Sequence, residues 1–460
     1  MKKQQYISVK GDLKTQNELF SLMENLFPIC RSITGNGLRK TLKILKKQID
    51  LKIIEVRTGT KVFDWKIPYE WNIKDAYVKN LKGERIIDFK KSNINVLNYS
   101  IPINKKISQK ELKRHLHTLP DKPNSVPYVT SYYKKNWGFC LAHNQLQLIN
   151  DDYYDVKIDS RLEPGFLTYG EFFKKGDSSD EILISTYVCH PSLCNDNISG
   201  IVVSTMLAKI LSKIKTHFSY RFLFIPETIG AITWLSKNEK NLSKIKCGLV
   251  ITCVGGNGIF TYKKTRHDNS VIDRISMNVL KNSKKPFQIR DFFPYGGDER
   301  QFSSPGINLP IGVFMRTPYY EFKEYHTADD NLKSVKKHAL NDSLVMLCKI
   351  ISKLEDEKII DKNIQKEKIR KSKSYIYLNL NPKCEPQLGR RKLYRDISKS
   401  RLVDKNDSQN LIELSICWML NFSDGYHSLN DISKKSSLSL KLLKQASKLL
   451  IEKNLLKKLN

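Results

Sequence analysis

The stretch 185–200 constrains this chain more than any other part of its sequence. A short apolar run (181–189) ends in His190, a small polar loop delivers Asp196, and an apolar segment of helical length (201–211) follows. A strand, a polar loop and a helix in this order are typical of α/β enzymes, which present their chemistry at the carboxyl end of a sheet. Zinc takes His nitrogen and carboxylate oxygen as ligands. The stretch therefore predicts two ligands of one metal ion.

His190 alone would not indicate a metal site, because a single His at the end of a strand is more often structural. The Asp on the same loop favours metal binding. Cys189 and Cys194 flank the loop and could be ligands or a nucleophile, but the nine cysteines are scattered without a Cys-x-x-Cys pair. We therefore interpret these two as small buried residues. Scattered thiols also predict a reducing, cytoplasmic location.

Short apolar runs alternate with amphipathic ones from residue 161 to residue 354. This alternation predicts a mixed or mostly parallel sheet with helices on both faces, an α/β fold. The predicted strands are 166–173, 181–189, 221–227, 248–256 and 309–314, and the predicted helices are 201–211, 229–235, 271–279 and 334–354.

The two ends of the chain and the region before residue 160 have a different character. Residues 12–50 are predicted to be helical, and strand-like runs such as 93–99 and 126–133 follow, which indicates an inserted β domain. Three helices with short turns near the C-terminus resemble a winged helix. The predicted domains are 1–62 (N-terminal part of the main domain), 63–162 (inserted β-rich domain), 163–375 (main α/β domain), 376–405 (linker) and 406–460 (winged helix).

The net charge of +32 invites a nucleic-acid or membrane-surface partner. Lys is spread along the whole chain, however, so we favour a solvated surface over a binding patch. The run 362–373 is predicted to be a solvated helix or linker. No signal peptide is evident at the start, and no apolar stretch approaches the roughly 20 residues of a membrane span. We therefore expect no membrane partner, and a homo-oligomer stays open.

Further candidate residues lie at the ends of other predicted strands and before the last long helix. Glu227 could be a ligand or a general base, or equally a carboxylate stabilised by a helix N-terminus. His326 could be a third ligand, and Asp329 or Asp330 could cap the following helix.

Four charged candidates could bind a substrate instead. Asp298, Glu299 and Arg300 lie beside a glycine turn and could bind the ends of a substrate or pair with one another. Arg31 belongs to a polar loop between two predicted helices. That loop could lie near the active site, or it could be a plain turn.

The order of these signals resembles the di-zinc aminopeptidase and glutaminyl-cyclase superfamily. Within it, the chain resembles bacterial aminopeptidase-like proteins with an inserted β domain and a C-terminal winged helix. The motifs are His190…Asp196-x-x-Ser-Gly, Glu227-x-x-Gly, Gly-x-Asp298-x-x-x-Phe and His326-Thr-x-x-Asp, with the supporting strings Pro28-Ile-Cys-Arg-Ser-Ile-Thr-Gly, Glu70-Trp-Asn-Ile-Lys-Asp-Ala and Asp298-Glu-Arg-Gln-Phe. The resemblance covers nearly the whole chain and implies a zinc-exopeptidase-like mixed sheet flanked by helices.

The resemblance implies that His190 and His326 bind metal, that Asp196 is the carboxylate shared by two metals, and that Glu227 is the general base. The chain departs from the pattern where Thr228 and Thr252 replace two carboxylate ligands and Ser192 replaces a supporting carboxylate. Three ligands and a water suffice for one catalytic zinc, whereas two ions would lack ligands. We therefore expect one zinc.

The resemblance implies a hydrolase that cleaves a peptide or a small amide with metal-activated water and Glu227 as the base. Because Thr228 replaces a residue that receives the substrate amino group, Glu299 or Glu324 could substitute for it. The alternatives are a ligand-sensing or nucleic-acid-binding regulator and a relative without catalysis. The recognition segment of the winged helix would lie at 439–448, but we favour a docking role for this module over nucleic-acid binding.

Overall fold

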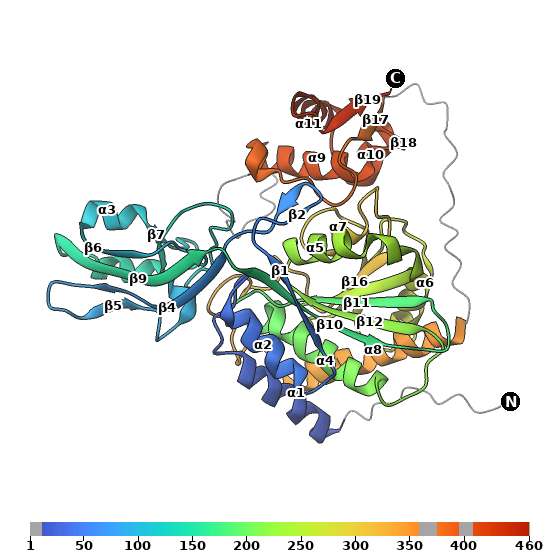
Figure 1. Ribbon diagram of the computed structural model, residues 1–460, viewed down its shortest axis with the longest axis horizontal. Helices are drawn as coiled ribbons and strands as arrows, with labels where there is room; N and C mark the ends of the chain where they lie inside the picture. Colours follow the sequence, from blue (N-terminus) through green and yellow to red (C-terminus); the bar gives the residue numbers. More distant parts are fainter. Residues whose placement is uncertain (1–11, 358–374, 395–407, 460) are drawn as a thin grey trace.

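The computed structural model describes residues 12–357, 375–394 and 408–459, and an eight-stranded mixed sheet forms its centre (Figure 1). The strand order is β1-β10-β12-β11-β13-β16-β14-β15, and the four neighbours β12, β11, β13 and β16 run parallel. The strands are β1 (Lys52–Arg57), β10 (Phe166–Lys174), β11 (Glu181–Tyr187), β12 (Ser219–Ile225), β13 (Ile245–Ile251), β14 (Phe260–Lys263), β15 (Phe287–Arg290) and β16 (Ile311–Met315). The predicted α/β sheet is confirmed.

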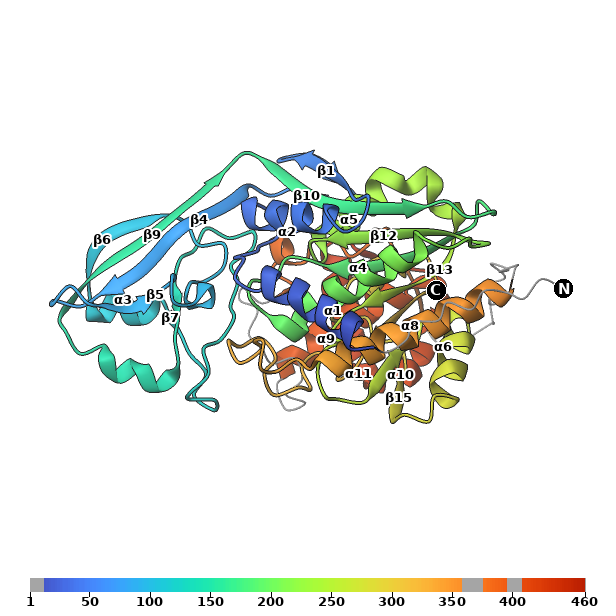
Figure 2. The same cartoon turned by 90° about the horizontal axis from the view of Figure 1, so that it is seen from below.

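Helices cover both faces of this sheet, as Figures 1 and 2 show. Every residue of β11 is buried, which explains its unbroken apolar run: strands covered on both faces do not alternate. Ile182 and Ile184 point to one helical layer and Leu183 to the other. The first layer contains α1 (Leu13–Leu26), α2 (Asn36–Lys46), α4 (Ser199–Leu211), α6 (Val271–Lys281) and α8 (Lys337–Glu357), and the second contains α5 (Ile229–Asn238) and α7 (Glu299–Phe302).

A second, four-stranded sheet lies at one end of the main body (Figures 1 and 2). Its order is β5-β4-β9-β6, and the long strands β4 and β9 pair antiparallel. Its strands are β4 (Glu70–Lys79), β5 (Arg85–Asp88), β6 (Ile103–Ser108) and β9 (Tyr153–Glu163), accompanied by α3 (Gln109–Arg114) and the short pair β7 (Leu116–His117) with β8 (Phe139–Cys140). A separate short pair, β2 (Lys61–Val62) with β3 (Trp65–Lys66), contacts α5 of the main body.

The expected strands 93–99 and 126–133 do not form. Residues 93–95 make a helical turn, and the rest contribute isolated bridges, among them Asn98 to Thr130 and Pro127 to Thr327. Ile94, Val126 and Tyr128 pack with Leu193 and Ala328 of the main domain, whereas Leu97 and Val129 pack with Cys140. This burial gives the segments a hydrophobic pattern that resembles that of a strand.

The C-terminal module is a three-helix unit with a small sheet, and it sits on the side of α5 and α7 (Figure 1). Its sheet has the order β18-β17-β19, so β17, from the stretch predicted to be a linker, belongs to it. Its elements are β17 (Ile376–Asn379), α9 (Ser408–Phe422), β18 (Asp424–Ser428), α10 (Leu429–Ser436), α11 (Leu440–Glu452) and β19 (Leu456–Lys458).

Three further sequence predictions concern the charged run, membrane spans and the cysteines. The charged run 362–373 lies outside the described residues. Among the described helices, none combines the length and the hydropathy that a membrane crossing requires. All nine cysteines are free thiols, and eight of them are buried.

Candidate metal site

The candidate site lies at the edge of the sheet where the parallel strands end. His190 follows β11, Glu227 follows β12, Thr252 follows β13, and the loop after β16 carries His326. The carboxyl ends of parallel strands meet at one edge, where α/β proteins bind their ligands. Residues more than 100 positions apart in the sequence are therefore neighbours.

Four side chains converge there. His190 Nδ1 lies 3.6 Å from Asp196 Oδ1, and His326 Nε2 lies 3.1 Å from Asp196 Oδ2. His190 Nε2 lies 3.6 Å from a carboxylate oxygen of Glu227. One ligand atom from each of His190, Asp196 and His326 fits within a span of 4.8 Å, which suits a single ion.

Three atoms of this group lack hydrogen bonds. His190 Nδ1, Asp196 Oδ2 and His326 Nε2 are all buried and have no hydrogen bond of normal geometry with any described residue. Unsatisfied buried polar atoms are costly, so three at one point need an explanation. Two nitrogens and one carboxylate oxygen are a donor set that zinc accepts. The residues present fit a bound zinc ion.

The other oxygen of Asp196 is already engaged. Tyr187 donates a short hydrogen bond from its hydroxyl to Asp196 Oδ1, and the same hydroxyl lies 2.7 Å from Thr252 Oγ1. Thr252 stands where the resemblance implies a carboxylate ligand. Because the Tyr187 hydroxyl bonds both to Asp196 and to Thr252, this side of the carboxylate faces a hydroxyl group rather than a second set of ligands.

The loop that carries Asp196 is held by its two asparagines. Asn195 Oδ1 accepts hydrogen bonds from the backbone amides of Gly255 and Gly256, at 2.9 and 3.0 Å. Asn197 Oδ1 accepts from Cys253 N at 3.2 Å. Both asparagines therefore tie the loop to the segment that follows β13.

Gly200 lies where this loop enters α4, and its lack of a side chain is required. A Cβ atom there would meet Asn197 Oδ1 at 2.3 Å and the carbonyl oxygen of Ile251 at 2.6 Å. The start of α4 can therefore approach the end of β13 closely. This approach brings Asp196 to the edge of the sheet.

Asp330 joins the two ligand loops. Its carboxylate accepts hydrogen bonds from Asn195 N and Asp196 N, at 2.7 and 2.8 Å. Burial raises the pKa of Asp330 to about 7. The expectation that Asp329 or Asp330 caps the next helix is wrong, because α8 begins only at Lys337. The His-Thr-x-x-Asp motif, which places an Asp four residues after His326, is the sequence signal for an Asp that accepts hydrogen bonds from the Asp196 loop.

Electrostatics favour the forms of His190 and Asp196 that could bind a metal. Burial lowers the pKa of His190 to about 4, so its ring is neutral at pH 7 and can offer a nitrogen. Burial alone would raise the pKa of Asp196, but His190, His326 and the Tyr187 hydroxyl hold it at about 2. Asp196 therefore remains a carboxylate.

Glu227 has the opposite electrostatic environment. Burial, followed by repulsion from Asp298 and Asp196, raises its pKa well above the usual range. Burial also raises the pKa of Asp298 to about 7. Asp298 Oδ1 accepts a 2.6 Å hydrogen bond from Thr228 N, and its Oδ2 is buried without a partner among the described residues. The pair is placed to hold or transfer a proton near neutral pH.

Arg31 was a candidate for substrate binding, and the structure corrects this. Its side chain is fully buried, and it donates to the carbonyl oxygens of His190 and Leu26, at 2.8 and 2.7 Å. A substrate cannot reach it. Arg31 instead links the end of β11 to the end of α1.

The remaining candidates for substrate binding lie in different surroundings. Glu299 is fully buried and pairs with Lys263, and Arg300 pairs with Glu385 at 2.6 Å, so both are engaged within the protein. Glu324 lies in a groove of about 540 Å³ lined also by Lys122 and Lys333, on the outer side of the loop. Of this group, Asp298 has the largest charge effect on the pKa of Glu227, which it raises.

Cys189 is buried beside the site, as expected. It offers a second ligand group with His190 and Glu227, but its sulfur accepts a hydrogen bond from Glu227 N at 3.3 Å. Burial, followed by repulsion from Glu227, raises its pKa well above the ordinary value, which opposes the thiolate that a metal needs. The group of two histidines and Asp196 is therefore the better metal site.

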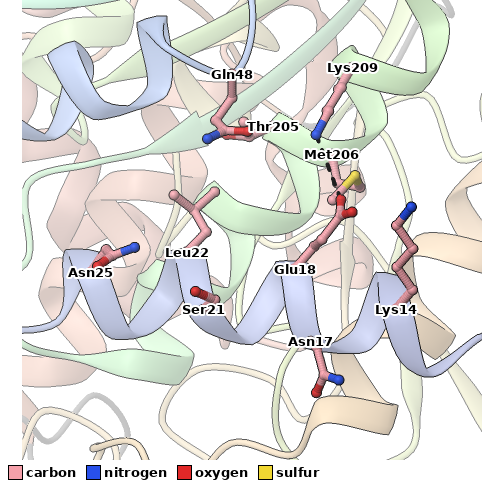
Figure 3. A pocket seen from close by; sticks show the side chains of 10 residues that line it. All are labelled: Lys14, Asn17, Glu18, Ser21, Leu22, Asn25, Gln48, Thr205, Met206 and Lys209. Carbon is pink, nitrogen blue, oxygen red and sulfur yellow. Dashed lines mark ion pairs between the residues drawn. The ribbon is translucent and has the colours of Figure 1, made fainter.

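A larger hollow lies elsewhere. A groove of about 650 Å³ between α1 and α4 is lined by polar side chains such as Asn17, Glu18 and Lys209, and Figure 3 shows Glu18 pointing to Lys209. It brings no histidine or cysteine to its walls. Its chemistry gives no support for a reaction centre.

The fold and the site define a class: an aminopeptidase-like α/β body joined to a winged helix. The chain belongs to the family described as a domain of unknown function, DUF4910, whose model matches residues 20–357. A winged helix-turn-helix model matches residues 375–458, which confirms the C-terminal prediction.

Two relatives and one distant fold neighbour agree with this. A Clostridium acetobutylicum protein named for polysaccharide biosynthesis, with an aminopeptidase-like domain, is 50% identical over 98% of both chains. A crystal structure of a candidate peptidase from the same organism is 50% identical, with a TM-score of 0.74 over 97% of both chains. A Bacillus subtilis zinc aminopeptidase shares the fold at 12% identity, with a TM-score of 0.55 over 75% of this chain and 96% of that one.

Proposed function

We propose that this protein is a zinc-dependent hydrolase that cleaves a peptide or a small amide, with one zinc held by His190, Asp196 and His326. The observation that carries the proposal is a set of three buried atoms without hydrogen bonds, one each from His190, Asp196 and His326, in a group that could hold one ion. Relatives with an aminopeptidase-like body support it.

A zinc ion in this site would supply Lewis acidity, which polarises a carbonyl and makes a water acidic near pH 7. The protein's own contribution is proton transfer and orientation. Glu227 takes a proton from the attacking water and returns it to the leaving amine. Tyr187 fixes the orientation of the Asp196 carboxylate, and Asp330 holds its backbone.

The substrate class rests on the peptidase-like relatives, so peptides are the first class to test. Asp298 is as fully buried as Arg31, so it acts through the charge it places near Glu227 and not by contact with the substrate. The relative named for polysaccharide biosynthesis makes amides of amino sugars a second class to test. We place the reaction in the cytoplasm, because nine free thiols persist in a reducing compartment.

The test uses zinc-loaded protein with a panel of aminoacyl anilides, dipeptides and N-acyl amino sugars. Glu227→Gln should keep its zinc and lose about 100- to 10,000-fold in turnover, because it removes the proton-transfer group. Glu18→Gln, in the groove between α1 and α4, is the matched control and should be unchanged. Turnover of the Gln variant at the wild-type rate would contradict the proposal.

A second candidate function concerns the winged helix. Lys441, Lys444 and Lys448 are exposed at helical spacing on α11, and Lys457 and Lys458 are exposed on the nearby β19. Such a face suits a phosphate backbone, and affinity for duplex DNA would then fall steeply with salt. If the protein is a non-catalytic regulator that binds DNA through this face, the wild type should cleave no substrate of the panel. Glu227→Gln should then bind DNA as the wild type does.

A further inference from the structure

The inserted region reaches into the metal site through the segment Ser125–Tyr132. We propose that this region is a working part of the site: residues 125–128 fix the loop of His326, and Tyr128 is a positioning residue for both histidine rings. The inference rests on the proposed metal site and adds to it a role for the insert.

The backbone of the segment pairs with the His326 loop on both sides. Tyr128 N donates to the carbonyl oxygen of His326 at 2.8 Å, and Ala328 N donates to that of Val126 at 2.9 Å. Pro127 and Thr327 form the antiparallel bridge between them. The loop that carries His326 is therefore paired with the insert as well as joined to β16 of the main sheet.

His326 needs such support. Its φ is +50°, in the left-handed region that residues with a side chain seldom adopt. A residue remains in this region only when its surroundings hold it there. The hydrogen bond from Tyr128 to its carbonyl oxygen does so directly, and Ser125 donates to the Asp329 carboxylate further along the loop.

The Tyr128 ring contacts both histidines. It lies edge-on to His190, with centroids 5.3 Å apart at 85°, and edge-on to His326, with centroids 5.2 Å apart at 87°. The two histidine rings are 5.4 Å apart. The Tyr128 ring is thus shared by both histidines, while Tyr187 contacts only His190 and Tyr325 stacks only on His326.

Tyr128 itself is fixed by the insert. It is 2% exposed and packs with Ile94 of the insert and Leu193 of the Asp196 loop. Its hydroxyl lies 3.0 Å from that of Tyr132. A second link, from Asn93 Nδ2 to Ser192 Oγ at 2.7 Å, joins the insert to the loop after His190. The loop that carries His190 and Asp196 and the loop that carries His326 therefore both contact the inserted region.

The ring and the hydroxyl of Tyr128 can be separated by substitution. Tyr128→Phe keeps the ring, and Tyr128→Leu removes it while leaving an apolar side chain. Positioning by the ring predicts that Phe behaves as the wild type and Leu does not. Tyr154→Leu is the matched control, because Tyr154 is an equally buried tyrosine in the core of the inserted sheet.

The first measurement is hydrogen exchange of the metal-free full-length chain. We expect Tyr128→Leu to speed exchange at the Ala328 amide and its neighbours, with a smaller effect for Ser125→Ala and none for Tyr128→Phe or Tyr154→Leu. Equal protection in Tyr128→Leu and Tyr154→Leu would overturn the inference without any reference to metal.

The second measurement is titration with cobalt(II), whose absorption reports the ligand geometry. Tyr128→Leu should bind about 10- to 100-fold more weakly, with an altered spectrum, as expected when a residue that orients ligands is lost. Tyr128→Phe should restore both properties. Phe and Leu variants that are equally impaired, or a wild-type spectrum in the Leu variant, would contradict ring positioning. Failure of the wild type to bind cobalt would instead sink the proposed function, and the exchange data would still decide the role of the insert.

Discussion

Single buried polar residues carry much of the structure around the candidate metal site. Arg31 is the clearest case, because its guanidinium is fully buried and its hydrogen bonds go to neutral carbonyl oxygens at the ends of β11 and α1. Burial, the largest effect, lowers its pKa to about 10, so it remains charged at pH 7. The partial negative charge at the C-terminus of α1 favours a cation there.

Arg31→Lys tests this structural role. A lysine has a single nitrogen and cannot present the planar fork that reaches both carbonyls. We expect the free energy of unfolding to fall by about 1–3 kcal/mol, the cost of leaving a buried acceptor unpaired. Urea unfolding measures it, with Arg274→Lys on the exposed side of α6 as the control. An equal free energy of unfolding in both variants would show that the two hydrogen bonds of the Arg31 guanidinium do not contribute to stability.

Sequence alone could not assign the roles of Arg31 and Asp330. Their partners are backbone atoms of residues brought close by the fold, Arg31 to the carbonyl of His190 and Asp330 to the amide of Asp196. Hydrogen bonds to backbone leave no residue pattern to recognise. His190, Asp196, Glu227 and His326 were predictable because their residue types and order follow a motif.

At the scale of elements, the junction of the Asp196 loop with α4 determines where the carboxylate lies. Two asparagines tie the loop to the segment after β13, and the glycine at position 200 permits the close approach of the helix. The alternation of strands and helices was predictable, since it depends on local periodicity. The pairing of residues 126–128 with the His326 loop was not, since it depends on contacts about 200 residues apart.

Gly200→Ala should disturb this junction. Its methyl group would overlap the Ile251 carbonyl and the Asn197 side chain, and overpacking of this kind costs about 1–3 kcal/mol. Zinc affinity should fall as well, because the loop carries Asp196. Gly389→Ala is the control, since a Cβ atom there meets nothing within 4 Å. Isothermal titration and urea unfolding check both effects, and an unchanged zinc affinity would refute the link between the helix start and the ligand.

At the scale of the whole molecule, the winged helix is packed firmly on the body. Arg266 of the body donates to the Asp424 carboxylate and to the carbonyl oxygen of Asn421, and its guanidinium lies 4.8 Å from the centre of the Phe422 ring. Phe292 and Phe293 of the body pack into the core of the module. This docking surface was not predictable, because the aromatic and charged residues that form it lie in separate segments.

The Asp424 contact predicts a pH dependence. Burial raises the pKa of Asp424, but hydrogen bonding to His427 and the charge of Arg266 outweigh it, so the folded-state pKa lies well below the usual value. The resulting stability is fully present above the unfolded pKa of about 4 and is lost as the pH falls towards the folded value.

Asp424→Asn removes this contribution. The variant should be less stable than the wild type at pH 7, and the difference should shrink as the pH falls below about 4, where the wild type begins to lose the same interaction. Thermal unfolding followed by the fluorescence of Trp418, which lies in the module core, reports it. A difference in stability that is equal at pH 7 and pH 3 would contradict this account.

The central claim is a single zinc ion held by two histidines and one aspartate, in a fold whose relatives include zinc aminopeptidases. Elemental analysis of dialysed, full-length protein measures it directly, with His326→Ala beside the wild type. The account predicts one tightly bound zinc per wild-type chain and none in the variant, because two remaining ligands do not hold the ion against dialysis. Two zinc ions per wild-type chain, or one retained in His326→Ala, would contradict it.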